Sequence, residues 1–266
     1  MSIISLLTDF GQKDPYVAEM KAVILSINPQ VRLVDITHQV TKFSIAHGAY
    51  CLASAALYFP SKTVHLAVVD PGVGTKRRPI IVETLRSFFV GPDNGLLILA
   101  AQKETITHVY CIENTNYMLP VVSQTFHGRD VFAPIAAHLT KGVTPREFGP
   151  EIHDYFVPKF TNPITEPRKI MGEVLHIDDF GNIISNISIQ HLEKAGITVG
   201  KRVSLVVGSQ RLMAPFCSVY GEVDLGHCLV LVGDNGFVEV AVNQGDASKV
   251  FGARVGDRFC LSVVTC

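Results

Sequence analysis

The sequence has no excess of charge of either sign and no long hydrophobic run. Its 266 residues contain 23 Lys and Arg against 24 Asp and Glu, a formal net charge of −1. A near-neutral chain does not favour a polyanion-binding surface, so nucleic acid is not an expected partner. The most apolar helical candidate, residues 45–59, is too short to span a bilayer, contains a histidine and ends at Pro60. We therefore expect no membrane partner either.

The cysteines also lack the spacing of a metal site. None of the six forms a CxxC pair, and most lie in apolar runs, where a free cysteine behaves as a small buried hydrophobe: Cys51, Cys111, Cys217, Cys228, Cys260 and Cys266. The opening MSIISLLTDFG has no basic segment and reaches Asp9 too early for a secretory signal. These features predict a cytoplasmic protein without a zinc site or any other bound metal.

Hydrophobic residues are plentiful, at 47%, and their rhythm changes along the chain. Residues 1–157 alternate strand-like and helix-like segments, the pattern of an α/β domain with a central sheet. Residues 158–169 contain three prolines, a composition typical of a linker. Residues 170–266 contain short strands separated by Gly, Asp and Asn turns, which predicts a smaller, all-β, barrel-like domain.

Acidic residues lie at or near the ends of several expected strands of the first domain. These residues are Asp9, Asp35, Asp70 and Asp93. Aspartate is favoured in turns of any protein, which is the structural explanation for each one taken alone. Ligands of open α/β sheets bind at the carboxyl edge of the strands, however, and four acids at one edge favour a site there.

The segment DPGVGTKRRP follows the strand that ends near Asp70. Its glycines, Gly72 and Gly74, resemble a nucleotide-binding loop, but such a loop needs a helix directly after it, and here another strand-like run follows. A tight reversal explains the glycines better. Such a reversal would bring Asp70 close to Arg77 or Arg78 on the returning segment, where a bidentate contact would fix the carboxylate.

His127, in QTFHGRDVF, lies where a loop meets an expected helix. A lone histidine is more often structural. The position at a loop–helix junction, outside any apolar face, favours a histidine that orients or deprotonates a water.

The second domain offers two polar turns. In IDDFGNIISNIS, the simple explanation is a hairpin turn. The functional one uses Phe180 as an aromatic face for a base, Asn182 as an amide for the edge of that base, and Asp178 or Asp179 as a carboxylate for an amine. A similar polar segment, GDNGFVEVAVNQGDAS, contains Asp234, Asn235 and Asn243, of which Asn235 is a further substrate-binding candidate.

Five segments in order, LLTDFG, VVDPGVGTKRRPI, GPDNGLL, TFHGRDVFAP and IDDFGNIISNI, resemble the S-adenosyl-L-methionine (SAM) hydroxide adenosyltransferases, or SAM hydrolases, relatives of the fluorinases and chlorinases. The resemblance covers nearly the whole chain. It implies hydrolysis of SAM to adenosine and L-methionine without a cofactor. It also implies an α/β N-terminal domain, a β-barrel C-terminal domain, and a trimer whose active sites lie between the first domain of one subunit and the second domain of the next.

Residue by residue, the resemblance implies a catalytic triad of Asp70, Arg77 and His127, with Arg77 preferred to Arg78 because it follows the aspartate by seven positions. It also implies substrate contacts, which are Asp9 for the ribose hydroxyls, Phe180 and Asn182 for adenine, and Asp178 for the methionine amine. The neighbouring Asp179 leaves that last assignment open.

Two other functions compete. A SAM-dependent halogenase would use chloride in place of water, but the Asp70 carboxylate would repel a halide, and the extra loop of the halogenating relatives has no counterpart between Glu83 and Phe126. A non-catalytic SAM or adenosine sensor would use Asp9 and Phe180 equally well. It would not need the triad.

Overall fold

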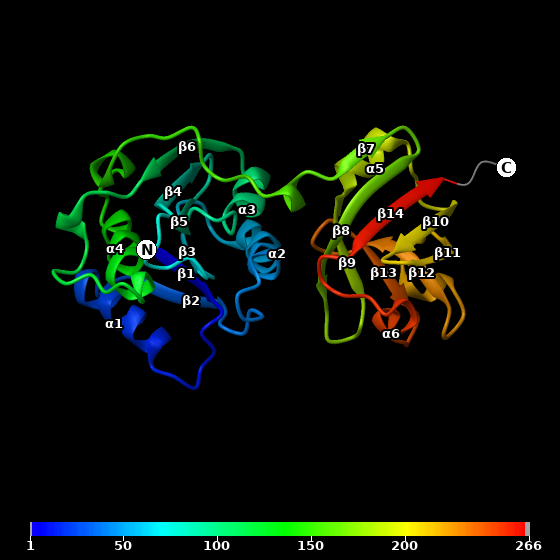
Figure 1. Ribbon diagram of the computed structural model, residues 1–266, viewed down its shortest axis with the longest axis horizontal. Helices are drawn as coiled ribbons and strands as arrows, with labels where there is room; N and C mark the ends of the chain where they lie inside the picture. The colour runs from blue at the N-terminus through cyan, green and yellow to red at the C-terminus, as the bar shows by residue number, and fades with distance from the viewer. Residues whose placement is uncertain (1, 264–266) are drawn as a thin grey trace. The chain divides into compact units, whose positions relative to one another are not determined.

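The computed structural model describes residues 2–263, so Cys266 lies outside the described part. The chain divides into two compact units, Met1–Pro158 and Lys159–Cys266 (Figure 1). The five cysteines within the described range are free thiols. Within the same range, no helix is both long and apolar enough to cross a bilayer.

The first unit is built on a six-stranded sheet with the order β2-β1-β3-β5-β4-β6. Its strands are β1 (Ile3–Thr8), β2 (Arg32–Thr37), β3 (Val64–Val68), β4 (Pro79–Thr84), β5 (Phe88–Pro92) and β6 (Ile106–Cys111). The four strands β2, β1, β3 and β5 run parallel, whereas β4 and β6 are antiparallel to their neighbours. Every residue of β3 is buried, as expected for a strand covered on both faces.

Helices cover both faces of this sheet. They are α1 (Tyr16–Ile27), α2 (Ile45–Ala55), α3 (Ile98–Lys103) and α4 (Ala133–Thr140), with the short turns η1 (Ala56–Tyr58), η2 (Thr115–Tyr117), η3 (Gly128–Phe132) and η4 (Pro145–Phe148). α1 packs against α4 on one face, and α2 packs against α3 on the other (Figure 1). The predicted α/β domain with a central sheet is confirmed.

Three of the four strand-end acids lie where the sequence predicts. Asp9 directly follows β1, Asp70 follows β3 after one residue, and Asp93 directly follows β5. The prediction was wrong for Asp35, which lies inside β2, pairs in register with Leu6 and forms an ion pair with Lys21. β2 is at the edge of the sheet, so a polar side chain within it can reach solvent.

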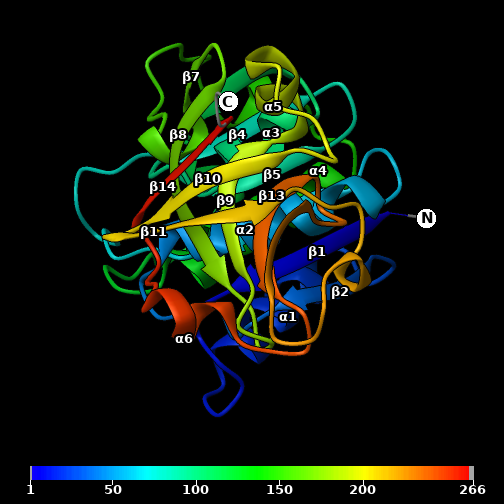
Figure 2. The ribbon, with the colours of Figure 1, turned by 90° about the vertical axis from the view of Figure 1, so that its right-hand side faces the viewer.

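The second unit is an eight-stranded antiparallel sheet with the order β11-β10-β14-β8-β9-β13-β12, and β7 pairs with β8. The strands are β7 (Ile164–Glu166), β8 (Lys169–Ile177), β9 (Ile183–Ser188), β10 (Arg202–Val207), β11 (Gln210–Pro215), β12 (Cys228–Val232), β13 (Phe237–Val242) and β14 (Arg258–Val263). A bridge between Phe216 and Val230 brings the two ends of the sheet together. The predicted barrel-like domain is confirmed, and Figure 2 shows its curled sheet.

Short helices complete this unit: α5 (Ile189–Ala195), α6 (Ala247–Phe251), η5 (Lys159–Thr161) and η6 (Tyr220–Glu222). The segment 158–169, predicted as a linker, contains η5 and β7. Pro163 and Pro167 flank β7 on either side, because proline is tolerated at the ends of a strand but not within its hydrogen-bond ladder.

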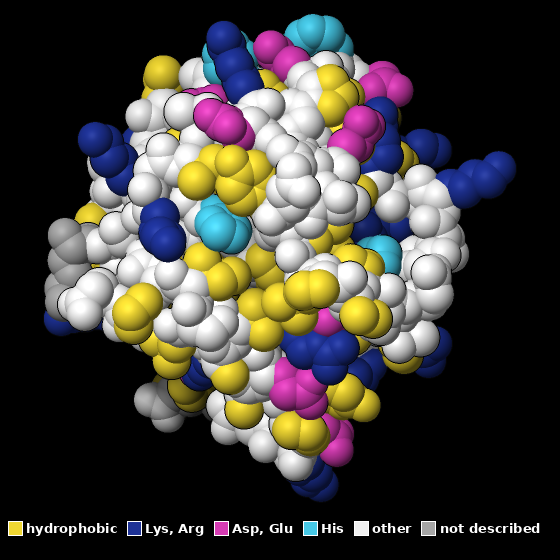
Figure 3. Space-filling model, turned by 90° about the vertical axis from the view of Figure 1, so that its left-hand side faces the viewer, with side chains coloured by type: hydrophobic (Ala, Val, Ile, Leu, Met, Phe, Trp, Pro, Cys, Tyr) yellow, Lys and Arg dark blue, Asp and Glu magenta, His cyan; other side chains and the backbone are white. Residues whose placement is uncertain are grey.

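The surface of the first unit drawn in Figure 3 mixes charges of both signs. Lys and Arg side chains lie among Asp and Glu side chains, and apolar side chains gather toward the middle. This face therefore presents no field of a single sign.

Candidate active site

The segment between β3 and β4 is a tight reversal. The backbone N–H of Val73 donates to the Asp70 carbonyl at 3.3 Å, and that of Thr75 donates to the Gly72 carbonyl at 3.2 Å. Gly74 has a φ of 73°, a left-handed conformation that favours glycine. The reversal returns the chain toward Asp70, so the sequence-based choice of a turn over a nucleotide loop is confirmed.

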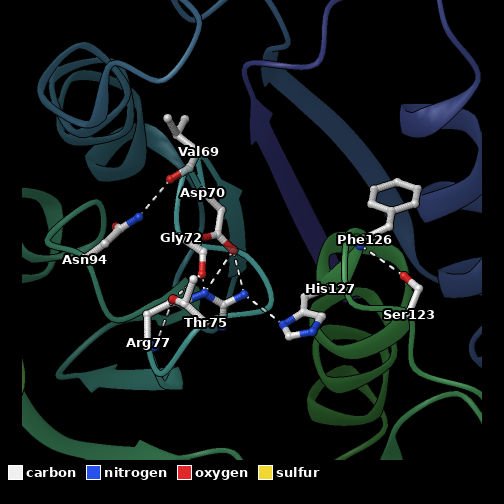
Figure 4. Close-up of polar contacts among 9 residues, drawn as sticks. All are labelled: Val69, Asp70, Gly72, Thr75, Arg77, Asn94, Ser123, Phe126 and His127. Atoms are coloured by element: carbon white, nitrogen blue, oxygen red, sulfur yellow. Dashed lines mark hydrogen bonds and ion pairs between the residues drawn. The ribbon is translucent and has the colours of Figure 1, made fainter.

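The turn brings Asp70 and Arg77 into a bidentate ion pair (Figure 4). Arg77 Nε donates to the two carboxylate oxygens at 3.1 and 2.9 Å, and Nη2 donates to Oδ2 at 2.5 Å. The side chains are 8% and 5% exposed for Arg77 and Asp70. Arg78 points elsewhere and pairs with Asp93 and Asp154. Arg77 is therefore the arginine that contacts Asp70.

His127 completes this cluster from a different element. It directly precedes the π-helical turn η3, and its Nδ1 lies 2.9 Å from Arg77 Nη2 (Figure 4). A guanidinium can only donate, so Nδ1 accepts and the proton of the neutral ring is on Nε2. Burial and the charge of Arg77 hold the pKa of His127 below its ordinary value. The ring is thus neutral near pH 7.

The loop before His127 packs directly on the Asp70 turn. A Cβ at Gly74 would overlap the backbone carbonyl oxygen of Gln124. The same loop is held by the fully buried Asp130, which accepts a hydrogen bond from Ser123 N at 2.8 Å. Asp130 also forms an ion pair with Arg129 at 2.7 Å. Sequence analysis missed these supporting residues. The adjacent Arg-Asp in HGRD was the signal that could have pointed to a buried ion pair.

A cavity of 420 Å³ opens beside this cluster. Its lining residues are Asp9, Phe10, Asp14, Tyr16, Lys42, Phe43 and Asp70. Asp9 is 5% exposed, its Oδ2 accepts from Phe43 N at 2.8 Å, and Lys42 Nζ contacts its carbonyl oxygen. The structure therefore brings Asp9 and Asp70 to one cavity, as predicted from their places at the sheet edge.

Lys42 and Phe43 were not identified from the sequence. Phe43 has a φ of 64°, unusual for a bulky residue, and its side chain is largely exposed. Backbone strain of this kind concentrates at ligand sites. No local sequence pattern signals it, because the hydrogen bond from Phe43 N to Asp9 joins residues 34 positions apart.

In the second unit, Asp178, Phe180 and Asn182 lie in one turn between β8 and β9. Asp178 Oδ1 accepts from the backbone N–H of Phe180 at 3.0 Å and of Asn182 at 2.8 Å, and its Oδ2 accepts from the Asn182 side-chain amide at 3.0 Å. Asp178 thus holds the turn, whereas its neighbour Asp179 is exposed. Gly181, with a φ of 83°, lies against the Asp246 carboxylate, which leaves no space for a larger side chain.

A second cavity, of 610 Å³, lies at this turn. It is lined by Phe180, Asn182, Tyr220, Val242, Asn243, Gln244, Gly245 and Asp246. Phe180 is 81% exposed, so its ring is accessible for stacking on a flat ligand. The sequence pointed to Asn243, whereas Tyr220, Val242 and residues 244–246 were missed, because they come from segments far from the DFGN turn in sequence.

Asn235 occupies a different turn, between β12 and β13. Its side-chain oxygen accepts from the backbone N–H of Phe237 at 3.0 Å. This bond stabilises the local turn, as expected for an asparagine that precedes glycine. Among residues 2–263, no group of three or more His, Cys, Asp or Glu side chains is arranged to hold a metal ion.

Comparison with known proteins gives matches over nearly the whole chain. A family model described as the SAM hydroxide adenosyltransferase N-terminal domain matches residues 4–149, and one described as the C-terminal domain of the same family matches residues 172–260. Proteins named (R)-S-adenosyl-L-methionine hydrolase from Salinispora tropica and Thermus thermophilus are each 38% identical over 96% of this chain and over 95% and 98% of their own lengths.

More distant relatives and solved structures agree with these matches. A protein named fluorinase from an Actinoplanes species is 26% identical over 96% of this chain and 95% of its own length. A crystal structure titled as an uncharacterized conserved protein from Thermotoga maritima superposes with a TM-score of 0.88 at 40% identity, covering 97% of this chain and 99% of that one.

Proposed function

The chain belongs to the SAM hydroxide adenosyltransferase family, and from this premise we propose that it hydrolyses SAM to adenosine and L-methionine. The observation that carries the proposal is the cluster of Asp70, Arg77 and His127 at the cavity that Asp9 also lines. A protein that only bound adenosine would have no use for this buried cluster. A halogenase would not place a carboxylate in the cavity where its halide must sit.

The reaction is a displacement at the ribose C5′. Oxygen of water forms a bond to C5′, the bond from C5′ to the sulfonium sulfur breaks, and its electron pair stays on sulfur as neutral methionine. One proton of the attacking water passes to the Asp70 carboxylate and from there to solvent. The leaving group needs no acid, because the sulfur loses its positive charge as it departs. What the enzyme must supply is an aligned water and a place for the partial positive charge on that water's hydrogens.

Asp70 is the group that accepts a hydrogen bond, and then the proton, from the attacking water. Its Oδ2 takes two hydrogen bonds from Arg77, whereas its Oδ1 takes one, at 3.1 Å. A carboxylate oxygen has two lone pairs, so Oδ1 has more capacity to accept a further hydrogen bond. Arg77 fixes the direction of that oxygen, because a bidentate contact prevents the carboxylate from rotating.

His127 positions Arg77 and does not act as the base. Its Nδ1 lone pair is directed at Arg77, and its Nε2 carries the proton. Neither nitrogen is therefore able to accept a proton from water while this contact lasts. A neutral histidine is the right partner here, because an imidazolium would point a proton at the guanidinium.

Substrate binding involves both units. Asp9 accepts hydrogen bonds from the ribose hydroxyls, Phe180 stacks on adenine, and the Asn182 side-chain oxygen accepts from its amino group. Asp178 binds the methionine amine with its remaining acceptor position, since three of its roughly four are used within the turn. Asp179 and Asn235 are alternative contacts for the same amino-acid end.

The names of the relatives suggest which form of SAM is used. They specify the (R) configuration at the sulfonium, and we propose the same preference here. The reaction uses no metal or redox cofactor, because neither the neutral leaving group nor the water attack calls for one. Protein dialysed against a metal chelator should therefore hydrolyse SAM at the same rate as untreated protein.

The protein functions as a cytoplasmic homotrimer in which the first domain of one subunit and the second domain of the next contribute to each site. Mixing Asp70→Ala and Phe180→Ala subunits tests this assembly at SAM concentrations well below KM, where the higher KM of Phe180→Ala makes it much less active than wild type. Subunits dissociated and reassembled together exceed the mean activity of the two parent variants if one site takes residues from two subunits. Light scattering gives the number of subunits, and cell fractionation gives the location.

The decisive experiment is incubation with (R)- and (S)-SAM in ¹⁸O-labelled water containing chloride, analysed by mass spectrometry. Adenosine labelled at the 5′-oxygen establishes transfer to water. A chlorinated nucleoside would instead establish halogenation, and bound but unchanged SAM would establish a sensor.

A further inference from the structure

A buried carboxylate lies in a strand that is otherwise apolar. Glu239 is 6% exposed, its neighbours along β13 are Val238 and Val240, and across the sheet it pairs with Leu231 and Ile184. A carboxylate in such surroundings lowers stability compared with an apolar side chain. Packing therefore does not explain why a glutamate is at this position.

The local electrostatics make the position less favourable still. Burial, together with the negative charges of Asp178 and Asp234, raises the pKa of Glu239. The compensating contact comes from Tyr220, whose hydroxyl donates to Glu239 Oε1 at 2.7 Å.

Tyr220 lies on η6, a turn of three residues held by a different glutamate. Glu222 Oε1 accepts from the backbone N–H groups of Ser218 and Val219 at 2.9 and 3.2 Å. These bonds fix the backbone of the turn but not the direction of the Tyr220 ring. The bond from its hydroxyl to Glu239 restrains the far end of the ring.

The Tyr220 ring lines the cavity that Phe180 and Asn182 also line. It is 44% exposed, so without a tether it would be able to rotate toward solvent. A ring that already stands in its bound orientation loses less conformational entropy when a ligand arrives.

We propose that Glu239 is a positioning residue, which holds the Tyr220 hydroxyl so that the ring forms a fixed wall of this cavity for the flat adenine of the substrate. The proposal rests on the proposed function for the location of adenine. It adds a residue that makes no contact with the substrate and acts on affinity, not on the chemical step.

The test compares Tyr220→Phe, Glu239→Ala, Glu239→Gln and the double variant Tyr220→Phe/Glu239→Ala. Adenosine affinity is measured by calorimetry, and KM and kcat for SAM are measured separately. We expect Tyr220→Phe and Glu239→Ala each to weaken adenosine binding and to raise KM about fivefold, with kcat within twofold of wild type. Glu239→Gln retains an acceptor oxygen for the tyrosine and stays within twofold of wild type in both constants.

The double variant is the sharpest arm. If Glu239 acts through the Tyr220 hydroxyl, the double variant binds adenosine no more weakly than Tyr220→Phe alone. The proposal would be overturned if the losses of adenosine affinity in the two single variants multiplied in the double variant. A fall in kcat at unchanged KM would also overturn it. Tyr220→Phe removes only one hydroxyl of a half-exposed side chain and folds whatever Glu239→Ala does, so unchanged adenosine affinity in that variant alone also overturns the proposal.

A matched control is Tyr117→Phe, which removes a tyrosine hydroxyl that contacts Glu147 at 3.4 Å in the first unit. Its affinity and kcat should match those of the wild type. If the wild-type protein binds adenosine but does not hydrolyse SAM, the proposed hydrolase function is wrong, and the adenosine affinities of the variants still test the role of Glu239. If the wild type hydrolyses SAM and the variants bind adenosine as tightly as the wild type, only the proposed role of Glu239 is wrong. A wild type that binds neither ligand contradicts both proposals.

Discussion

The two units hold their candidate functional side chains in different ways. In the first unit, Asp70, Arg77 and His127 hold one another, and the ion pair is almost completely buried. In the second, Phe180 stands exposed on a turn, and only the backbone and the Asn182 amide beneath it are fixed by Asp178.

This contrast matches the two tasks of a displacement enzyme. Groups that act on the transition state must be in place before it forms, because any reorganisation at that moment raises the barrier. The arginine, the carboxylate and the neutral histidine meet that requirement within one unit. Groups that recognise a flat base can gain much of their burial from the ligand itself, so an exposed ring is acceptable there.

The largest expected effect breaks the cluster of the first unit. Asp70→Ala should lower kcat by about a thousandfold or more, because the water loses its acceptor, while adenosine affinity stays within about twofold. Asp93→Ala is the matched control, since Asp93 is also a strand-end carboxylate paired with an arginine, Arg78. Loss of adenosine binding in Asp70→Ala, measured by calorimetry, would contradict the division of tasks.

A second substitution tests whether geometry or charge matters in this cluster. Arg77→Lys keeps the charge but cannot contact Asp70 and His127 together, so kcat should fall about a hundredfold. Arg78→Lys, one residue further along, should change kcat by less than about threefold. Equal losses of kcat in the two variants, measured by steady-state kinetics, would mean that the contact between Arg77 and His127 does not contribute to catalysis.

In the second unit, the effect should appear in binding. Phe180→Ala removes the stacking face and should raise KM for SAM about tenfold, with kcat within about threefold of wild type. The exposed Val199→Ala on the same unit is a control for loss of surface apolar area. A fall in kcat as large as that of Asp70→Ala would erase the distinction between the units.

The smallest expected effect is a pH dependence confined to the first unit. The neutral form of His127 accepts from Arg77, and its pKa is lowered by burial and by Arg77. Activity should therefore be constant near pH 7 and should fall as the pH drops through this lowered pKa, because the imidazolium repels the guanidinium. The profile of kcat against pH is the measurement.

The matched variant for this profile is His127→Asn. Its side-chain oxygen takes the place of Nδ1 and does not titrate, so the acid limb should disappear, although kcat is lower throughout. An acid limb that persists unchanged in His127→Asn would show that another group controls it.

Much of the fold was predictable because its core segments have clear hydrophobic patterns. The runs at β1, β3 and β13 are buried at nearly every position. Sequence analysis did not identify β6, β7 or β11, which contain exposed or partly exposed residues and lie at or near sheet edges. Their formation depends on a neighbouring strand more than on their own pattern. The same dependence explains Asp35, whose edge strand continues past it.

The sequence by itself determined the local chemistry: the reversal at DPGVG, the turn at DFGN, and the residues able to act on water or to hold a base. These are short-range features, governed by backbone sterics and turn residues. Only the tertiary structure decided the partners. It directed Nδ1 of His127 to Arg77, pressed Gln124 against Gly74, and joined Tyr220 to Glu239. Such contacts link segments 19 to 50 residues apart, and packing of whole elements, not any local pattern, brings them together.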